Sequence, residues 1–220
     1  MSRLTPANLV DELGPVDIYL FDQVLKGRFP PGTRVLDAGC GGGRNLVFFL
    51  RNGYPVAGVD RSSGAVSATK QRARELLPAS MVESTFLDDA FRVEAVEDLS
   101  FPDASFDVVI ASALLHFARD EAHFRGMIAE LWRVLAPRGF LFTRLATTIG
   151  IEDRVERIEG RRFHLPDGTD RFLADQKMLE GFEAELGARP LEPLKTVNVA
   201  HLRAMTTWVV EKSAAGGQRG

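Results

Sequence analysis

Short apolar runs alternate along the chain with longer segments in which apolar residues recur every three or four positions. The short runs predict buried β-strands, because a strand that is covered on both faces is apolar throughout. They lie at residues 34–37, 55–60, 91–95, 106–113 and 140–145. The helical spacing predicts α-helices at residues 44–52, 63–77, 120–135 and 174–186. This alternation favours an α/β fold in which helices flank a parallel sheet.

Breaker residues mark several of these boundaries. Gly53 follows one predicted helix as a C-cap glycine does, and Pro78 stops another that begins at Ser63. Residues 137–139, Pro-Arg-Gly, predict a turn into the strand at 140–145. Ligands of parallel sheets bind outside the carboxyl ends of the strands, so functional residues are expected directly after each strand.

The segment at residues 149–173 interrupts the alternation and is rich in Arg, Glu and Asp. Its sequence Pro166-Asp167-Gly168-Thr169 predicts a turn that joins residues 162–165 and 170–173 in a small hairpin. After the next helix, residues 191–199 and 205–211 are predicted to form two closing strands. The small, polar tail at residues 213–220 is expected to be disordered.

Composition narrows the function classes. The chain has 220 residues, the size of one domain, and a net charge of −3, which disfavours nucleic acid and membrane surfaces as partners. The longest nearly apolar run, residues 108–115, is far shorter than the ~20 residues of a membrane helix. Cys40 is the only cysteine, so neither a disulfide framework nor a metal site is expected. With no export signal in the first residues, the cytoplasm is the expected compartment.

A strand, a glycine turn and a helix start follow one another at residues 35–45, VLDAGCGGGRN. Gly39 and Gly41 fit the dinucleotide fingerprint G-x-G-x-x-G, but its third glycine falls on Arg44. Asp37, at the strand end, would repel a pyrophosphate and attract an ammonium group. The turn therefore favours a ligand with a cationic amine over a nicotinamide dinucleotide, which stays the weaker alternative.

Asp60 ends the next strand, where a carboxylate can accept both hydroxyls of a ribose. An ammonium group at one end of a ligand and a ribose at the other describe S-adenosylmethionine. Both carboxylates therefore predict this cofactor.

Four motifs follow one another over roughly residues 30–145: the glycine turn, VAGVDRS at 56–62, EDLSFPDASFDVV at 97–109 and LAPRGF at 135–140. In this order they resemble the motifs of class I S-adenosylmethionine-dependent methyltransferases. GRN at residues 43–45 and RNGYPV at 51–56 make the chain similar to the methyltransferase-11 and tellurite-resistance subgroup.

The resemblance implies a Rossmann-like, mostly parallel seven-stranded sheet flanked by helices, with an antiparallel last strand and the small inserted hairpin. We expect a single domain over residues 1–212, with a helical cap at 1–29, a cofactor-binding core at 30–145 and a substrate-side hairpin at 149–173.

The resemblance also implies residue roles in cofactor binding. Asp37, Gly39 and Gly41 would hold the methionine moiety, with Cys40 as a small buried residue inside the same turn. Asp60 would bind the ribose and Arg61 would lie along the adenine, whereas the main chain of Ala111 would face the transferable methyl. Many relatives carry an adenine-contacting Asp where this chain has Ala95; the N–H of Val96 remains available, and Glu94 or Glu97 is a substitute for the missing carboxylate.

Candidate acceptor residues follow the strands or lie in the hairpin. Methyl transfer is an in-line displacement for which the protein holds the acceptor and excludes water. His116 is the candidate general base, needed only if the nucleophile is protonated. Tyr19, Arg144, Arg162 and His164 are the candidate substrate contacts, and the arginines favour a small anionic acceptor. A non-catalytic S-adenosylmethionine-binding regulatory module is the alternative, and oligomeric state stays open.

Overall fold

The computed structural model describes residue 9 and residues 13–77 and 84–214. The chain divides into two compact units, Met1–Val96 and Glu97–Gly220, and each is described by itself. Of the expected helical cap at residues 1–29, residues 1–8 and 10–12 lie outside the described residues, as do residues 215–220 of the tail that was expected to be disordered. The single domain over residues 1–212 stays a prediction.

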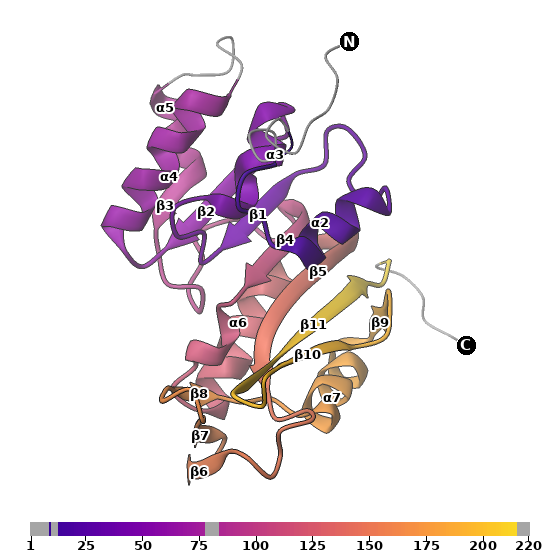
Figure 1. The fold of residues 1–220 in the computed structure, drawn as a ribbon. Helices are drawn as coiled ribbons and strands as arrows, with labels where there is room; N and C mark the ends of the chain where they lie inside the picture. The colour runs from indigo at the N-terminus through magenta and orange to yellow at the C-terminus, as the bar shows by residue number, and fades with distance from the viewer. Residues whose placement is uncertain (1–8, 10–12, 78–83, 215–220) are drawn as a thin grey trace, which may run out of the picture. The chain divides into compact units, whose positions relative to one another are not determined.

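The first unit holds a parallel three-stranded ladder in which β2 lies between β1 and β3 (Figure 1). Every residue of β1 is buried, as expected of a strand covered on both faces. Helix α4 packs on β2 and β3. The elements are α2 (Ile18–Leu25), β1 (Val35–Ala38), the 3₁₀ turn η1 (Arg44–Leu46), α3 (Val47–Arg51), β2 (Val56–Asp60), α4 (Ser63–Leu76), α5 (Ser84–Ala90) and β3 (Phe91–Val93).

Local capping explains where these helices begin. The side chain of Ser62 accepts the N–H of Ala65 at 3.3 Å, so the cap stands one residue before the predicted helix start. Asp17 caps α2 through the N–H of Tyr19, at 2.9 Å. The sequence pattern missed α5, because a helix of seven residues shows too few periodic positions to be recognised.

In the second unit, β5 pairs in parallel with β4 on one side and antiparallel with β11 on the other. Both β9 and β10 are antiparallel to β11, so β11 alone runs against the other strands. The predicted antiparallel last strand is therefore confirmed. The strands are β4 (Phe106–Ser112), β5 (Leu135–Thr147), β9 (Ala188–Pro190), β10 (Lys195–Val199) and β11 (Arg203–Lys212).

The turn predicted at residues 137–139 is wrong as a strand boundary, because β5 already begins at Leu135. The turn-like backbone survives as an irregularity inside the strand. Arg138 has φ 65°, and the β4–β5 register shifts between Phe106 and Val108. A Cβ on Gly139 would lie 2.5 Å from the carbonyl oxygen of Asp107, so no side chain fits there.

Two helices of the second unit carry aspartate caps. Asp120 accepts the N–H of His123 before α6 (Glu121–Val134), and Asp175 accepts that of Met178 before α7 (Gln176–Leu186), each at 2.7 Å. The apolar face of α6 is buried as predicted, except that Trp132 is only half-buried. Its ring lies 5.7 Å from the Lys212 ammonium group.

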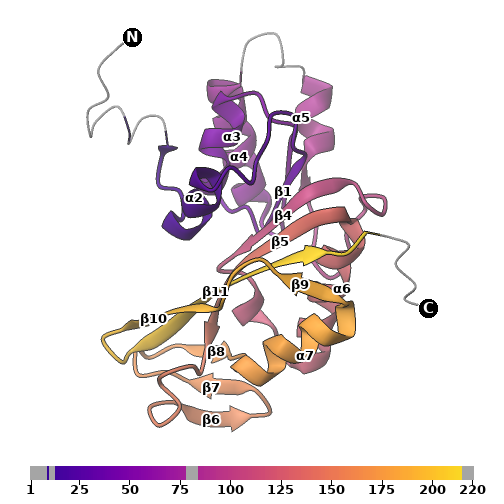
Figure 2. The ribbon, with the colours of Figure 1, turned by 90° about the vertical axis from the view of Figure 1, so that its right-hand side faces the viewer.

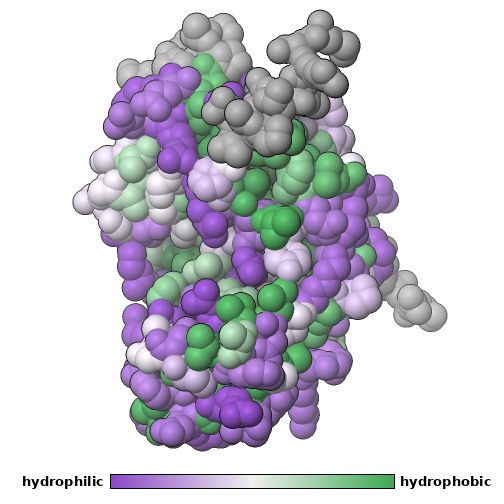
Figure 3. Space-filling model, viewed as in Figure 1, coloured by the Kyte–Doolittle hydropathy of each residue, from purple (hydrophilic) through white to green (hydrophobic). Residues whose placement is uncertain are grey.

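The inserted segment forms a three-stranded antiparallel sheet, β6 (Glu156–Glu159), β7 (Arg162–His164) and β8 (Asp170–Phe172), with β7 in the middle (Figure 2). The predicted hairpin is confirmed as β7–β8. Strand β6 escaped the pattern because all its residues are exposed, so no apolar alternation marks it. Phe163, Leu165 and Leu173 pack with Ala146 of β5 in a small core. The outer surface over β6–β8 is mostly hydrophilic (Figure 3).

All seven expected strands exist among the described residues, and the short β9 adds an eighth. The predicted fold class, a mostly parallel Rossmann-like α/β architecture, is confirmed. Within the described ranges, no helix has the length and apolarity that crossing a bilayer demands.

Candidate functional site

The glycine turn after β1 is held by backbone hydrogen bonds to β2. The N–H groups of Gly39 and Cys40 both donate to the carbonyl of Val59, at 2.8 and 2.9 Å. Gly39 and Gly41 have φ of 73° and 53°, a region that residues with a Cβ rarely adopt. A Cβ built on Gly41 would meet nothing within 4 Å, so this face of the turn is open for a ligand.

Asp37 lies in β1, one residue before the strand ends at the glycine turn, and its buried carboxylate has no hydrogen-bond partner among the described residues. The exposed fraction of the residue is 1%. Burial raises the pKa of Asp37 to about 7; Arg44 lowers it and Asp60 raises it. A buried, unpartnered carboxyl group beside an open glycine turn fits the ammonium group of a ligand.

Asp60 is fixed by the backbone on either side of it. Its Oδ2 accepts the N–H of Gly41 at 3.0 Å, and its Oδ1 accepts that of Ser62 at 2.9 Å. Each carboxylate oxygen keeps a second lone pair, so the group can still accept ribose hydroxyls. Arg61 is exposed beside it. The turn and the end of β2 are thus joined through the residue that was predicted to bind the ribose.

Cys40 packs away from the open face of the turn. Its Sγ lies 3.7 Å from Thr69 Oγ1, and a Cβ on Gly58 would stand only 3.1 Å from the Cys40 Cβ. Burial, with a smaller contribution from Asp37, raises the pKa of the thiol to about 12. Cys40 is buried, as predicted, and any contact with the cofactor would come from its main chain.

After β3, the residues predicted to contact the adenine are Ala95 and Val96, and they would do so through the main chain. Ala95 is half-buried and Val96 is buried. Glu94, in the same unit, has a carboxylate 4.0 Å from Arg92. Glu97 belongs to the second unit, where its carboxylate lies 3.0 Å from His123 Nε2. Both carboxylates therefore have partners, and the substitution of either for the missing aspartate stays a prediction.

The GRN motif has a structural role that the sequence did not reveal. Asn45, 4% exposed, accepts the N–H of Asp17 through its side-chain oxygen at 3.1 Å. It therefore ties the segment before α2 to the glycine turn. Tyr19 lies on α2, and its predicted contact with substrate stays a prediction.

In the second unit, a cavity of about 290 Å³ opens beyond the carboxyl ends of β4 and β5. Ala111 lies just inside β4, and Ala113 directly after the strand has φ 60°. The N–H of Ala113 donates to the carbonyl of Arg144 at 2.7 Å, which holds this strained turn against β5. The cavity is lined by Ala113, His116, Arg144, Ala146, Leu165, Asp167, Thr169, Arg171, Val199, Arg203 and Met205.

His116 and Arg144, predicted separately, are brought together in this cavity. His116 lies in the 3₁₀ turn η3 (Leu115–Phe117) and is 7% exposed. Its Nδ1 accepts the N–H of Ala146 at 3.3 Å. Burial and the charge of Arg171 lower the pKa of His116 to about 4, so the ring is neutral near pH 7. Arg171 and Arg203, also in the wall, carried no signal in the sequence that set them apart from other surface arginines.

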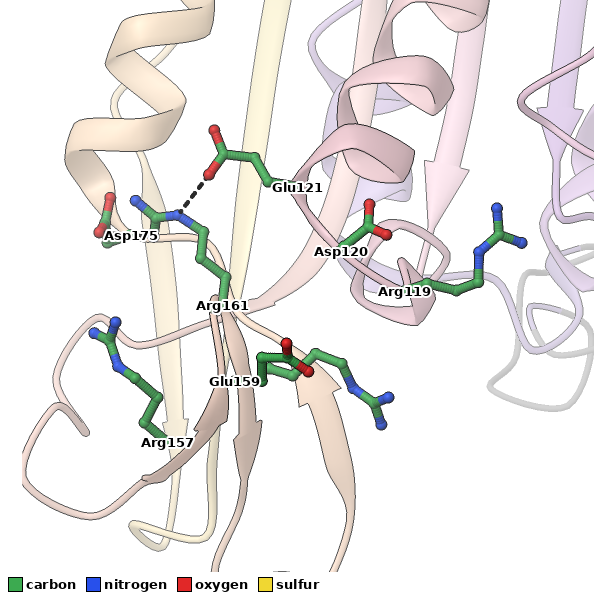
Figure 4. A pocket seen from close by; sticks show the side chains of 9 residues that line it. Arg119, Asp120, Glu121, Arg157, Glu159, Arg161 and Asp175 are labelled. Atoms are coloured by element: carbon green, nitrogen blue, oxygen red, sulfur yellow. Dashed lines mark hydrogen bonds and ion pairs between the residues drawn. The ribbon is translucent and has the colours of Figure 1, made fainter.

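Arg162 lines a different and larger cavity, of about 550 Å³ (Figure 4). Its lining contains four arginines and four carboxylates, so the charges balance. Arg161 lies between two of these acids, 2.9 Å from Asp175 and 3.7 Å from Glu121 (Figure 4). A balanced wall with internal ion pairs gives an anion little net attraction.

His164 does not line either cavity. Its Nδ1 lies 2.8 Å from the carboxylate of Asp170, directly across the β7–β8 hairpin. His164 thus pairs within its own hairpin, and its predicted contact with a substrate stays a prediction.

Known proteins resemble this chain in sequence. A family model described as "Methyltransferase domain" matches residues 36–143. A 2-methyl-6-phytyl-1,4-hydroquinone methyltransferase from Synechocystis is 40% identical over 113 residues, 51% of this chain and 31% of that protein. A 27-O-demethylrifamycin SV methyltransferase from Amycolatopsis mediterranei is 33% identical over 183 residues, 80% of this chain and 61% of that protein. The chain thus spans less than two thirds of either relative.

The fold is also similar to that of a known methyltransferase. A crystal structure of a SAM-dependent methyltransferase from Methanosarcina mazei superposes with a TM-score of 0.70 at 22% identity, over 87% of this chain and 97% of that one. The matched segment includes the glycine turn, Asp60 and β4, and the unpartnered carboxylate of Asp37 suits the amine of S-adenosylmethionine. Over residues 36–143 the chain therefore matches the methyltransferase-domain family, and its fold is similar to that of S-adenosylmethionine-dependent methyltransferases.

Proposed function

We propose that this chain transfers the methyl group of S-adenosylmethionine to a small-molecule acceptor in the cavity beyond β4 and β5. The observation that carries this proposal is which residues line the cavity. Ala113 lines it, on the same strand end as Ala111, where the family resemblance puts the reacting methyl. The cavity approaches the 300–1,000 Å³ typical of small-ligand sites.

Different residues of the first unit bind different parts of S-adenosylmethionine. Asp37 pairs with the ammonium group, the open face of the glycine turn at Gly41 meets the methionine moiety, and Asp60 receives the ribose. Arg61 and the main chain at Ala95 and Val96 flank the adenine. When bound, S-adenosylmethionine supplies a methyl group already activated for displacement, and the protein's task is to orient the acceptor and exclude water.

A small molecule is the best-supported class of acceptor. Relatives are named for methylating a phytyl hydroquinone and a rifamycin, which are small molecules. The net charge of −3 gives the chain no general attraction for nucleic acid. The arginines around the cavity add a preference for anionic acceptors, which we develop below.

Calorimetry with S-adenosylmethionine tests the first half of the proposal, and we expect binding at micromolar concentrations. Transfer is then followed by mass spectrometry over a panel of thiols, phenols and carboxylic acids. No binding at millimolar cofactor would contradict the proposal. Binding without transfer to any acceptor would favour a non-catalytic regulatory module, and preferential binding of NADH would favour an oxidoreductase.

A further inference from the structure

We infer that the acceptor is a small organic acid bound as its carboxylate by Arg144, Arg171 and Arg203, and that His116 meets it as a hydrogen-bond donor rather than as a base. That the bound acid is the methyl acceptor rests on the proposed function. The acid site itself rests on the cavity alone.

The charges of the cavity wall are strongly one-sided. The lining contains three guanidinium groups and one carboxylate, that of Asp167. His116, also in the lining, adds no charge because its ring is neutral. Partial burial raises the pKa of Asp167, but hydrogen bonds from Thr169 and the charge of Arg203 outweigh it and leave the pKa below its ordinary value. Asp167 therefore stays ionised, and the lining holds three positive side chains and one negative one. The larger cavity, whose charges balance, has no such excess.

Strand register brings Arg144 and Arg203 onto one sheet face together with Ala146 and Met205. Residues alternate faces along a strand, so Arg144 and Ala146 share a face of β5. Across the ladder, Met205 pairs with Ala146 and Thr207 pairs with Arg144. Arg203 belongs to the same face of β11 as Met205. A ligand that fits must be anionic at one end and apolar at the other.

The size and chemistry of the wall favour a carboxylic acid. Leu165, Val199 and Met205 supply apolar surface, and a cavity of about 290 Å³ holds a ring or a short chain with one charged group. A guanidinium group binds a carboxylate through two parallel hydrogen bonds. A carboxylate is also ionised at neutral pH without help, so binding it needs no base.

The tautomer of His116 decides what that ring can do. A backbone N–H always donates, so the bond from Ala146 means that Nδ1 presents a lone pair. In the neutral ring the proton then sits on Nε2, which is a donor. A general base at Nε2 would need the opposite tautomer and would lose the bond to Ala146. Arg144, Arg171, Arg203 and Asp167 line the same cavity as His116, and burial together with the charge of Arg171 opposes formation of an imidazolium.

Binding of 4-methylbenzoate tests the acid site without any methyl transfer. Titrations followed by NMR, with no S-adenosylmethionine present, compare it with the neutral isostere 4-methylbenzamide. We expect the acid to bind at least tenfold more tightly than the amide. Arg171→Gln and Arg203→Gln should each weaken binding of the acid about tenfold, because each removes a charge-assisted hydrogen bond. The matched control Arg119→Gln, in the wall of the larger cavity, should leave binding of the acid unchanged.

Equal affinity for acid and amide would overturn the inference, as would tighter binding of inorganic phosphate than of the acid. Both outcomes are independent of the proposed function. If the acid binds but no carboxylic acid is ever methylated, the proposed function fails and the acid site stands. If neutral molecules are methylated and the acid does not bind, the proposed function stands and the inference fails.

The role of His116 is tested by two readouts. Long-range ¹H–¹⁵N spectra, assigned by the loss of one histidine in His116→Gln, should show a neutral ring protonated on Nε2 between pH 5.5 and 8. His116→Gln keeps an N–H donor and should bind 4-methylbenzoate within about threefold of wild type, whereas His116→Leu should lose about tenfold. A ring protonated on Nδ1, or equal binding by both variants, would contradict the donor role.

Discussion

The backbone N–H of Ala146 donates to Nδ1 of His116 across 3.3 Å, which joins strand β5 to the turn that follows β4. The carbonyl of Arg144, two residues earlier on β5, accepts the N–H of Ala113 at 2.7 Å. One stretch of strand therefore fixes both the ring and the backbone at the mouth of the cavity. Because backbone groups hold these residues in place, the side chains around them stay available to bind a ligand.

Asp60→Ala should weaken binding of S-adenosylmethionine at least tenfold. The carboxylate both accepts ribose hydroxyls and holds the N–H groups of Gly41 and Ser62, so its loss also loosens the turn. Calorimetry measures the change. The matched control is Asp88→Ala, whose exposed carboxylate pairs with Lys70 in the same unit and should leave the affinity within twofold. Unchanged affinity in Asp60→Ala would mean that the ribose is bound elsewhere.

Cofactor binding at pH 6 should release close to one proton. The pKa of Asp37 is about 7 in the free protein, so its carboxyl group is mostly protonated at that pH. An ammonium group beside it favours the carboxylate and expels the proton. Calorimetry in two buffers with different ionisation enthalpies counts the protons. Asp37→Asn should bind S-adenosylmethionine more weakly and release no proton. If the wild-type protein also released no proton, Asp37 would not lie beside the amine.

The same carboxyl group should make the free protein less stable as the pH rises. Its folded pKa, about 7, lies above its unfolded value near 3.8, so the folded chain binds more protons between these values. The free energy of unfolding contributed by Asp37 is therefore fully present below about pH 4 and is lost as the pH rises toward about 7. Denaturant unfolding at pH 5 and 7.5 should show wild type losing stability relative to Asp37→Asn. A difference that does not change with pH would contradict the shifted pKa.

Gly139→Ala should lower the free energy of unfolding by about 2–4 kcal/mol, because its Cβ would overlap the backbone oxygen of Asp107. Backbone in paired strands cannot move away cheaply. Gly181→Ala is the control: it lies on the exposed face of α7 with nothing within 4 Å, and alanine there should stabilise by about 0.5–1 kcal/mol. Urea unfolding measures both. Equal stability of the two variants would show that the β4–β5 irregularity tolerates a side chain.

The thiol of Cys40 should react very slowly with iodoacetamide at pH 8. It is 4% exposed and burial raises its pKa to about 12, so almost no thiolate is present. Mass spectrometry should find the native chain unmodified after an hour and one alkylated cysteine after denaturation. Rapid labelling of the native chain would place the thiol on the open side of the glycine turn.

Local pattern alone predicted the cofactor half of the site. Asp37 and Asp60 lie at or next to the carboxyl ends of apolar strands, and a parallel ladder places such ends at one edge. The turn between them needs glycines at positive φ, and Gly39 and Gly41 provide them. Each of these signals lies within a few residues of its neighbour, so the sequence is sufficient to read them.

The acceptor half was decided by the tertiary structure. Arg144, Arg171 and Arg203 come from three strands and converge only because β5, β8 and β11 pack around one cavity. Arg162 and His164 are two residues apart, yet one lines another cavity and the other pairs across its hairpin with Asp170. Charge in a sequence does not reveal its partners, because pairing depends on strand register and on packing between distant segments.

The sequence by itself determined the order of strands and helices, the glycine turn and the carboxylates that suit S-adenosylmethionine, since all of these follow from local periodicity and local charge. Only the tertiary structure decided the protonation of His116. The partner that fixes its tautomer is Ala146, 30 residues away. The burial and the Arg171 charge that keep the ring neutral come from the folded chain, because desolvation and fields between distant groups exist only after folding.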